Sequence, residues 1–312
     1  MSAKKKAADA AIVPANGASM PGRARVQKAY KIYVGGAFVR SESGRYFQVT
    51  DVGGDEPGLV ENIALSSRKD GRDAVKAAHA AGGGWAGKSA YNRGQILYRL
   101  AEVMEGRRAE LAAEIERGLG VTREAARDEV LASVDRVISF AGWSDKFQSL
   151  LASSNPVAGP HFTFSVPEPM GVVAVVAPRR PSLLGLVSAI LPVVVSGNTC
   201  VVLASEDDPR TAVTFCECLA TSDMPGGVVN LLTGRVKEVA PHLARHMEVQ
   251  ALDLWLDDAE LVKELETLAV ATVKRVKKHA VAGVDFGDER LAGLASLTPF
   301  LETKTFWHPM GM

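Results

Sequence analysis

The sequence lacks the features that mark several classes of protein. Its 36 basic and 36 acidic side chains give a formal net charge of +0, which argues against a nucleic-acid-binding protein because such proteins are usually basic. The three cysteines, Cys200, Cys216 and Cys218, fit neither a disulfide framework nor a metal-binding spacing. We therefore expect no metal site and a reducing compartment, the cytoplasm. The most apolar stretch, residues 183–195, is too short to span a bilayer, so no membrane partner is expected.

What the sequence does contain is the composition of a globular protein. Its 312 residues are 47% apolar and 23% charged, which is enough for one large domain or two modest ones. Residues 1–29 are assigned to a disordered tail, because residues 1–22 are rich in Ala, Lys and small side chains and hold no apolar core. This composition also differs from that of a secretory signal. A docking tail is the less favoured alternative.

Residues 30–282 are assigned to one domain, which opens with short strands followed by helices. Two strands are predicted around the Gly35-Gly36 turn within residues 31–39, and a third over residues 46–50. The run Gly82-Gly83-Gly84-Trp85 is expected to separate the first two helices. Apolar residues at helical spacing predict helices over residues 70–81, 92–105, 107–117 and 122–147.

The second part of this domain alternates apolar strands with amphipathic helices. Strands are predicted over residues 171–177, 198–203, 228–232 and 251–255, and helices over residues 182–195, 209–221, 236–245 and 258–270. Residues 273–281 form a further strand, and its lysines favour an edge position. Such an alternation requires a parallel sheet covered on both faces. The predicted fold class is therefore α/β, with a doubly wound, Rossmann-like sheet.

Two further segments are predicted to project from or close this domain. Residues 155–170 are interpreted as an arm, in which Phe162, Phe164 and Val166 alternate along one side of a strand. Residues 283–312 are interpreted as a connector with a short helix at residues 289–297, followed by a terminal strand over residues 300–307. Both segments carry apolar side chains that one sheet domain does not need.

Several short motifs occur in a fixed order. They are Met170-Gly171-Val172-Val173, Gly197-Asn198-Thr199, Ser205-Glu206, the run from Pro225 to Gly234, and the tail from Phe300 to Trp307. Together they resemble the aldehyde dehydrogenase superfamily. The resemblance implies a cofactor domain, an oligomerisation arm and a closing tail, with a catalytic domain between the sheet and the tail. Because no such domain intervenes here, the chain is similar to a truncated, degenerate member. It most resembles the C-terminal pseudo-half of family-sixteen aldehyde dehydrogenases.

The positions that carry chemistry in the superfamily differ in this chain. The resemblance puts Arg180 at the oxyanion-donor asparagine, Leu203 at the ribose-binding lysine, and Trp255 and Asp257 in the small-residue turn beneath the cofactor pyrophosphate. Only Glu206 is retained, and a helix-start glutamate also suits the helix dipole. A carboxylate and an indole in a phosphate turn oppose anion binding. We therefore expect no cofactor, with NAD as the disfavoured alternative.

No catalytic residue is predicted. The resemblance puts His279 at the position of the general base, but a single histidine on a strand is interpreted as a half-exposed residue. The superfamily nucleophile lies in a Gly-Gln-x-Cys segment that this sequence does not contain. Its three cysteines fall in a predicted strand and a predicted helix, where they suit small buried side chains.

The favoured hypothesis is a catalytically inactive subunit with a structural or regulatory role. Its partner would be a full-length aldehyde dehydrogenase, held by strand addition through the arm and the tail. One alternative is an NAD(P)-dependent oxidoreductase subunit that still binds nucleotide, and another is a homodimer in which two copies exchange tails. The residues expected at the oligomer interface are Phe162, Phe164, Val166, Glu302, Lys304, Phe306 and Trp307.

Overall fold

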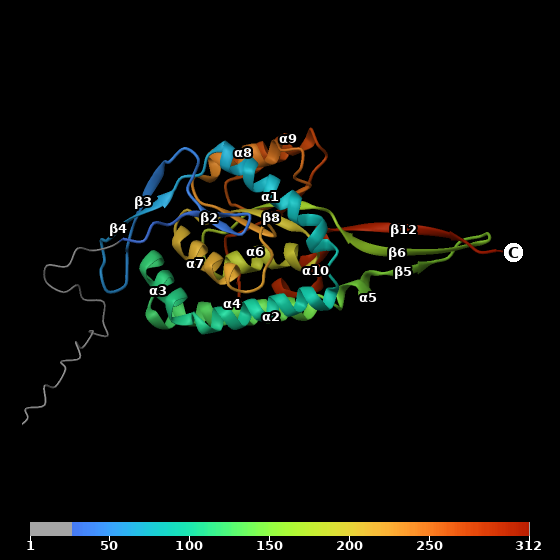
Figure 1. Ribbon diagram of the computed structural model, residues 1–312, viewed down its shortest axis with the longest axis horizontal. Helices are drawn as coiled ribbons and strands as arrows, with labels where there is room; N and C mark the ends of the chain where they lie inside the picture. The colour runs from blue at the N-terminus through green and yellow to red at the C-terminus, as the bar shows by residue number, and fades with distance from the viewer. Residues whose placement is uncertain (1–26, 312) are drawn as a thin grey trace, which may run out of the picture.

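A seven-stranded sheet lies at the centre of the protein, whose computed structural model describes residues 27–311 (Figure 1). The strand order is β11-β10-β7-β8-β9-β1-β2. The five parallel strands are β7 (Val172–Val176), β8 (Thr199–Leu203), β9 (Val229–Leu232), β10 (Ala251–Trp255) and β11 (Arg275–His279). Strands β1 (Ile32–Val34) and β2 (Ala37–Val39) extend the sheet in antiparallel fashion. The chain winds outward from β7 in both directions, which confirms the predicted doubly wound fold.

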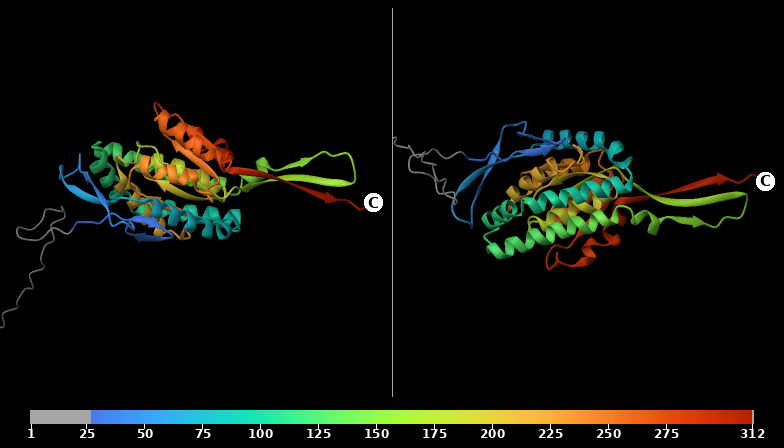
Figure 2. Two further views of the ribbon diagram at one scale, coloured as in Figure 1. Left: turned by 90° about the horizontal axis from the view of Figure 1, so that it is seen from above. Right: turned by 60° about the horizontal axis from the view of Figure 1, so that its bottom comes forward.

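Helices cover both faces of this sheet (Figures 1 and 2). One face packs against α1 (Arg68–Ala86), α8 (Val236–Arg245) and α9 (Ala259–Val270). The other face packs against α6 (Leu184–Val195) and α7 (Pro209–Ala220). A further layer of α2 (Ala90–Gly106), α3 (Arg108–Leu119) and α4 (Arg123–Trp143) covers α6 and α7. With helices on both sides, β7, β8, β9 and β10 are buried along their whole length.

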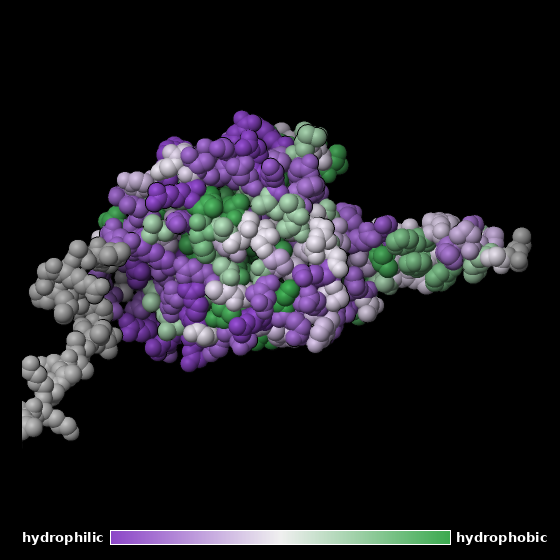
Figure 3. Space-filling view, viewed as in Figure 1, coloured by the Kyte–Doolittle hydropathy of each residue, from purple (hydrophilic) through white to green (hydrophobic). Residues whose placement is uncertain are grey.

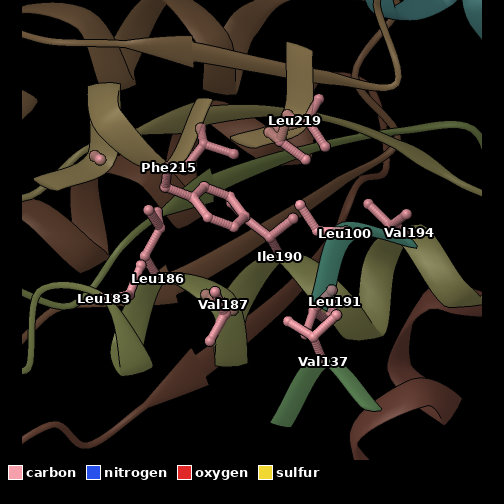
Figure 4. Packing of buried hydrophobic residues seen from close by; sticks show 14 of the residues in the cluster. Leu100, Val137, Leu183, Leu186, Val187, Ile190, Leu191, Val194, Phe215 and Leu219 are labelled. Carbon is pink, nitrogen blue, oxygen red and sulfur yellow. The ribbon is translucent and has the colours of Figure 1, made fainter. Parts of the chain in front are cut away.

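Helix α6 is the centre of the larger apolar core. All of its residues are buried, because it lies between the sheet and the outer helices. In Figure 4, Ile190 of α6 lies beside Phe215 of α7, and Leu191 lies beside Val137 of α4. This continuous apolar stretch is therefore a core helix, as its length predicts, and among residues 27–311 no helix is long and apolar enough to cross a membrane.

Helix α1 differs from its prediction because it continues through the three glycines to Ala86. The expected break at Gly82 to Trp85 is therefore wrong. Each glycine in a helix interior costs about 1 kcal/mol relative to alanine. Trp85 offsets this cost, because its side chain is 1% exposed and its Nε1 donates a 2.9 Å hydrogen bond to the carbonyl oxygen of Val194.

A small two-stranded sheet at the start of the chain consists of β3 (Tyr46–Thr50) and β4 (Val60–Ala64). The first was predicted and the second was not. Buried ion pairs fix this unit to the helices: Asp51 and Glu61 both pair with Arg117 of α3 and Arg210 of α7. Arg117 Nε lies 2.8 Å from Asp51, and Arg210 Nη1 lies 3.2 Å from Glu61.

The connector forms three short helices where one was predicted. They are η1 (Glu289–Ala292), α10 (Leu294–Leu297) and η2 (Thr298–Phe300). The predicted helix is interrupted because Gly293 has an extended backbone conformation. Leu297 and Phe300 are nevertheless buried against the core, so the connector is a packed part of the body.

A three-stranded antiparallel arm projects from the body (Figures 1 and 2). The chain reaches it through α5 (Phe147–Leu151), and its order is β12 (Leu301–Pro309), β6 (His161–Pro169) and β5 (Ser153–Asn155). Strand β12 pairs with β6 along its whole length. The predicted arm strand and terminal strand are thus neighbours in one sheet. Residues 1–26 of the predicted tail lie outside the described residues, whereas Lys28 forms a 2.8 Å ion pair with Glu217.

Candidate functional site

A crevice opens at the carboxyl ends of β7, β8 and β10, the place where doubly wound sheets usually bind ligands. Its volume is 320 Å³. Three of the residues predicted from the sequence, Glu206, Trp255 and Asp257, line it. Leu203 does not, because it is buried in the core between Val176 and Leu232 on the neighbouring strands.

The amide groups at the starts of the helices along this edge of the sheet are already bonded to carboxylates. Such amides are the usual donors to a bound phosphate, because they carry the positive end of the helix dipole. Here the contacts run from Leu183 N to Glu129 Oε1 (2.7 Å), from Val236 N to Glu206 Oε1 (2.8 Å) and from Leu261 N to Asp258 Oδ1 (3.0 Å). A phosphate could reach these amides only by displacing a carboxylate of the chain.

The two aspartates after β10 have different roles. Asp258 caps α9, as the sequence indicates, and also lies 2.8 Å from Lys237 Nζ. Asp257 accepts hydrogen bonds from the amides of Val281 (2.9 Å) and Ala282 (3.3 Å). It thereby ties the end of β10 to the segment after β11, and its carboxylate borders the crevice.

His279 belongs to a more organised group than its sequence context predicts. Its Nε2 lies 2.7 Å from Asp253 Oδ1, and its ring stacks on Trp255 with 3.6 Å between centroids. The Trp255 indole in turn donates a 2.8 Å hydrogen bond to Asp253 Oδ2. The side chain of His279 is only 20% exposed, less than the half-exposed residue expected. Asp253 was missed, although an aspartate within the apolar run Ala251–Trp255 was the available signal.

Arg180 lies on the surface, in agreement with its interpretation. Its side chain is 59% exposed, and its Nε lies 3.5 Å from Asp207 Oδ2. Arg179 pairs with the same carboxylate. The position expected to hold an oxyanion donor therefore holds a solvated guanidinium that shares one carboxylate with Arg179.

The cysteines are buried thiols without nucleophilic character. Burial raises the pKa of Cys218 to about 11, and it raises the pKa values of Cys200 and Cys216 further. A thiol with such a pKa holds almost no thiolate at neutral pH. Between residues 27 and 311, no three His, Cys, Asp or Glu side chains are grouped closely enough to hold a metal ion.

The arm has one aromatic face. Phe164 of β6 stacks on Phe306 of β12 with ring centroids 5.0 Å apart, and Phe162 lies 5.7 Å from Phe164. Lys304 lies on the same face, where it forms a 3.3 Å ion pair with Glu168. Phe162 is 47% exposed and Phe306 is 36% exposed, so this face is open to solvent in the single chain.

Trp307 lies on the opposite, more polar face of the arm, apart from the other predicted interface residues. Successive side chains of a strand point to opposite faces, so Trp307 lies beside His161, at 5.9 Å between ring centroids. Ser165 on this face bonds to Asn155 and Thr305, both at 2.8 Å. The residues predicted from the sequence to form one interface thus divide between two faces.

Comparison with known proteins agrees with this architecture. The model of the aldehyde dehydrogenase family matches residues 38–275. Mouse (Mus musculus) cytosolic 10-formyltetrahydrofolate dehydrogenase is 30% identical over 257 residues, which are 80% of this chain and 28% of that protein. The DhaS protein of Bacillus subtilis (strain 168) is 28% identical over 255 residues, 80% of this chain and 50% of its own length. A solved NAD-dependent aldehyde dehydrogenase from Sinorhizobium meliloti has a TM-score of 0.74 and 25% identity, covering 80% of this chain and 49% of that one.

The chain therefore spans half or less of the length of these three relatives. The matched part contains the whole parallel sheet up to the beginning of β11. On this match and on the fold, the chain belongs to the aldehyde dehydrogenase family.

Proposed function

We propose that this chain is a catalytically inactive family member that acts as a structural or regulatory subunit of a complete aldehyde dehydrogenase. The observation that carries the proposal is the path of the chain after β11. Residues 280–300 lead directly through the packed connector to β12 of the arm. No catalytic domain is inserted at this point, where the resemblance places one, and the elements for association remain.

The crevice supports the inactive part of the proposal. Its residues do not fit a nicotinamide dinucleotide, because Asp258 occupies an amide at the start of α9, the helix that the resemblance places beneath the pyrophosphate. Asp257 adds a second carboxylate, and the indole of Trp255, the last residue of β10, also lines the crevice. These contacts support the inactive role that we propose.

The arm supports the association part of the proposal. Strand β12 uses one edge to pair with β6, while its outer edge has no partner strand among the described residues. An unpaired strand edge beside exposed phenylalanines is suited to strand addition by another chain. A complete aldehyde dehydrogenase subunit would supply the catalytic domain that such an arm covers.

Co-expression with a full-length aldehyde dehydrogenase from the same source tests this proposal. We expect the two chains to co-purify as one species in light scattering, and the paired substitution Phe164→Ser and Phe306→Ser to release the partner. The matched control is Tyr91→Ser, which removes an aromatic ring that is 70% exposed on α2, outside the arm. A native chain that pairs only with itself would favour the homodimer. A native chain that stays monomeric in the presence of the partner would contradict both the hetero-oligomer and the homodimer.

A further inference from the structure

A second cavity, of 310 Å³, lies between α1 and α8 and shares no lining residue with the crevice or the arm. Three arginines and two histidines surround it: Arg68 and Arg72 from α1, and His242, Arg245 and His246 from α8 and its C-cap. Figure 3 shows hydrophilic residues over this upper part of the body. We propose that this cavity binds a small polyanion carrying phosphate or several carboxylate groups.

The positive charge in this cavity is not balanced within the described part of the chain. Arg68 and Arg245 form no ion pair there, and Arg72 pairs only with its neighbour Asp73, at 3.0 Å. None of the lining residues is acidic. Exposed arginines usually find a carboxylate or point separately into solvent, whereas these converge on one hollow.

The helix dipole explains only half of this arrangement. Basic side chains are favourable at the C-terminus of a helix, which accounts for His242 and Arg245 in the last turn of α8. Arg68 is the first residue of α1, where a cation meets the positive end of the dipole. An anion bound between the two helices would stabilise both sets of cations, because guanidinium groups donate in pairs to phosphate and carboxylate oxygens.

The two histidines add a pH dependence to this site. Burial lowers the pKa of His242, and Arg68 and Arg245 lower it further. Burial also lowers the pKa of His246. Its surroundings have opposing effects: Glu248 raises that pKa, and Lys274 and Arg72 lower it.

A bound anion would raise both of these pKa values. The two imidazoles would then take up protons on binding, a contribution that favours binding at lower pH. His246 Nδ1 accepts from the amide of Glu248 at 3.2 Å, which leaves Nε2 as the ring donor in the neutral form.

A hollow of this size suits a small ligand and not a nucleic acid, which would need an extended basic stripe. The shared chemistry of the ligand is two or more negative charges on adjacent oxygen-bearing groups. Pyrophosphate and citrate represent its two sources, phosphorylated compounds and polycarboxylates.

Isothermal titration of the full chain at low salt tests the proposal with pyrophosphate and with citrate. We expect one site with submillimolar affinity for at least one probe. The double variant Arg68→Gln and Arg245→Gln should bind at least tenfold more weakly. Both positions are exposed, so folding should persist, and the single variant Arg245→Gln provides a milder test.

The matched control is Arg40→Gln and Arg45→Gln, two exposed arginines outside the cavity. This pair removes the same charge and should leave the affinity unchanged. The absence of detectable binding heat with both probes at 10 mM would overturn the proposal. It would also be overturned if the control pair lost as much affinity as the Arg68 and Arg245 pair, because binding would then follow net charge and not this cavity. Neither outcome bears on the arm, so the proposed subunit role is tested separately.

Discussion

The native chain should not bind NAD⁺ with useful affinity, and Asp258→Asn should partly restore binding. Asp258 Oδ1 lies 3.0 Å from Leu261 N, so a phosphate oxygen at that amide must displace it. Losing a hydrogen bond to a charged group costs about 1.5–3 kcal/mol. A phosphate that remains about 4 Å from the displaced carboxylate adds a repulsion of about 4 kcal/mol at an effective dielectric constant of 20.

The sum, about 6 kcal/mol, corresponds to roughly four orders of magnitude in Kd, so a micromolar site would become a site of about 10 mM. Asparagine keeps the shape of Asp258 and removes its charge, which should lower the Kd below 10 mM while Asp257 still borders the crevice. Titration calorimetry with NAD⁺ measures both proteins, with Glu248→Gln as the control outside the crevice. Micromolar binding by the native chain would refute this reasoning.

Three further predictions concern stability and reactivity. Asp51→Ala should destabilise the fold by about 3–5 kcal/mol in urea unfolding, because it leaves Arg210 buried with an incomplete set of partners; a loss below about 1 kcal/mol would show that the ion cluster is dispensable. The three thiols should resist a thiol-specific chromogenic reagent at pH 8 and react fully in guanidinium chloride, since a pKa of about 11 leaves about one thousandth of Cys218 ionised. Rapid labelling of the folded chain would disprove this. Asp258→Asn keeps the helix cap and removes the charge; the bond to Lys237 lowers the pKa of Asp258, so the stability advantage of the native chain should be full above about pH 5 and vanish as the pH falls through that lowered pKa. An advantage that persists at pH 2 would contradict the assignment.

The parallel sheet could be predicted from the sequence because its signals are local. Apolar runs such as Ala251–Trp255 and Val236–Arg245 coincide with β10 and α8 at both ends. Tertiary contacts decide the elements that were wrong or missed. The glycines of α1 look like a break until Trp85 is known to be buried against α6. Strand β4 has two polar residues in succession, Glu61 and Asn62, and it is fixed by ion pairs to helices far along the chain.

The candidate site shows the same limit. The loss of the expected side chains at Arg180 and Leu203 can be read directly from the sequence. The carboxylates that occupy the helix amides cannot, because Glu129 and Glu206 reach amides far from them in sequence. The basic cavity likewise combines α1 with α8, whose arginines have no sequence pattern in common. Sequence reasoning identifies absent chemistry more readily than groups assembled by folding.

The most direct test of the central claim is aldehyde oxidation by a mixed complex. The partner would be a full-length aldehyde dehydrogenase whose nucleophilic cysteine is replaced by serine, co-purified with the native chain. We expect the complex to form and to produce no NADH, because on our proposal this chain contributes the arm and no catalytic group. NADH production above that of the serine variant alone, or failure of the two chains to associate, would contradict it.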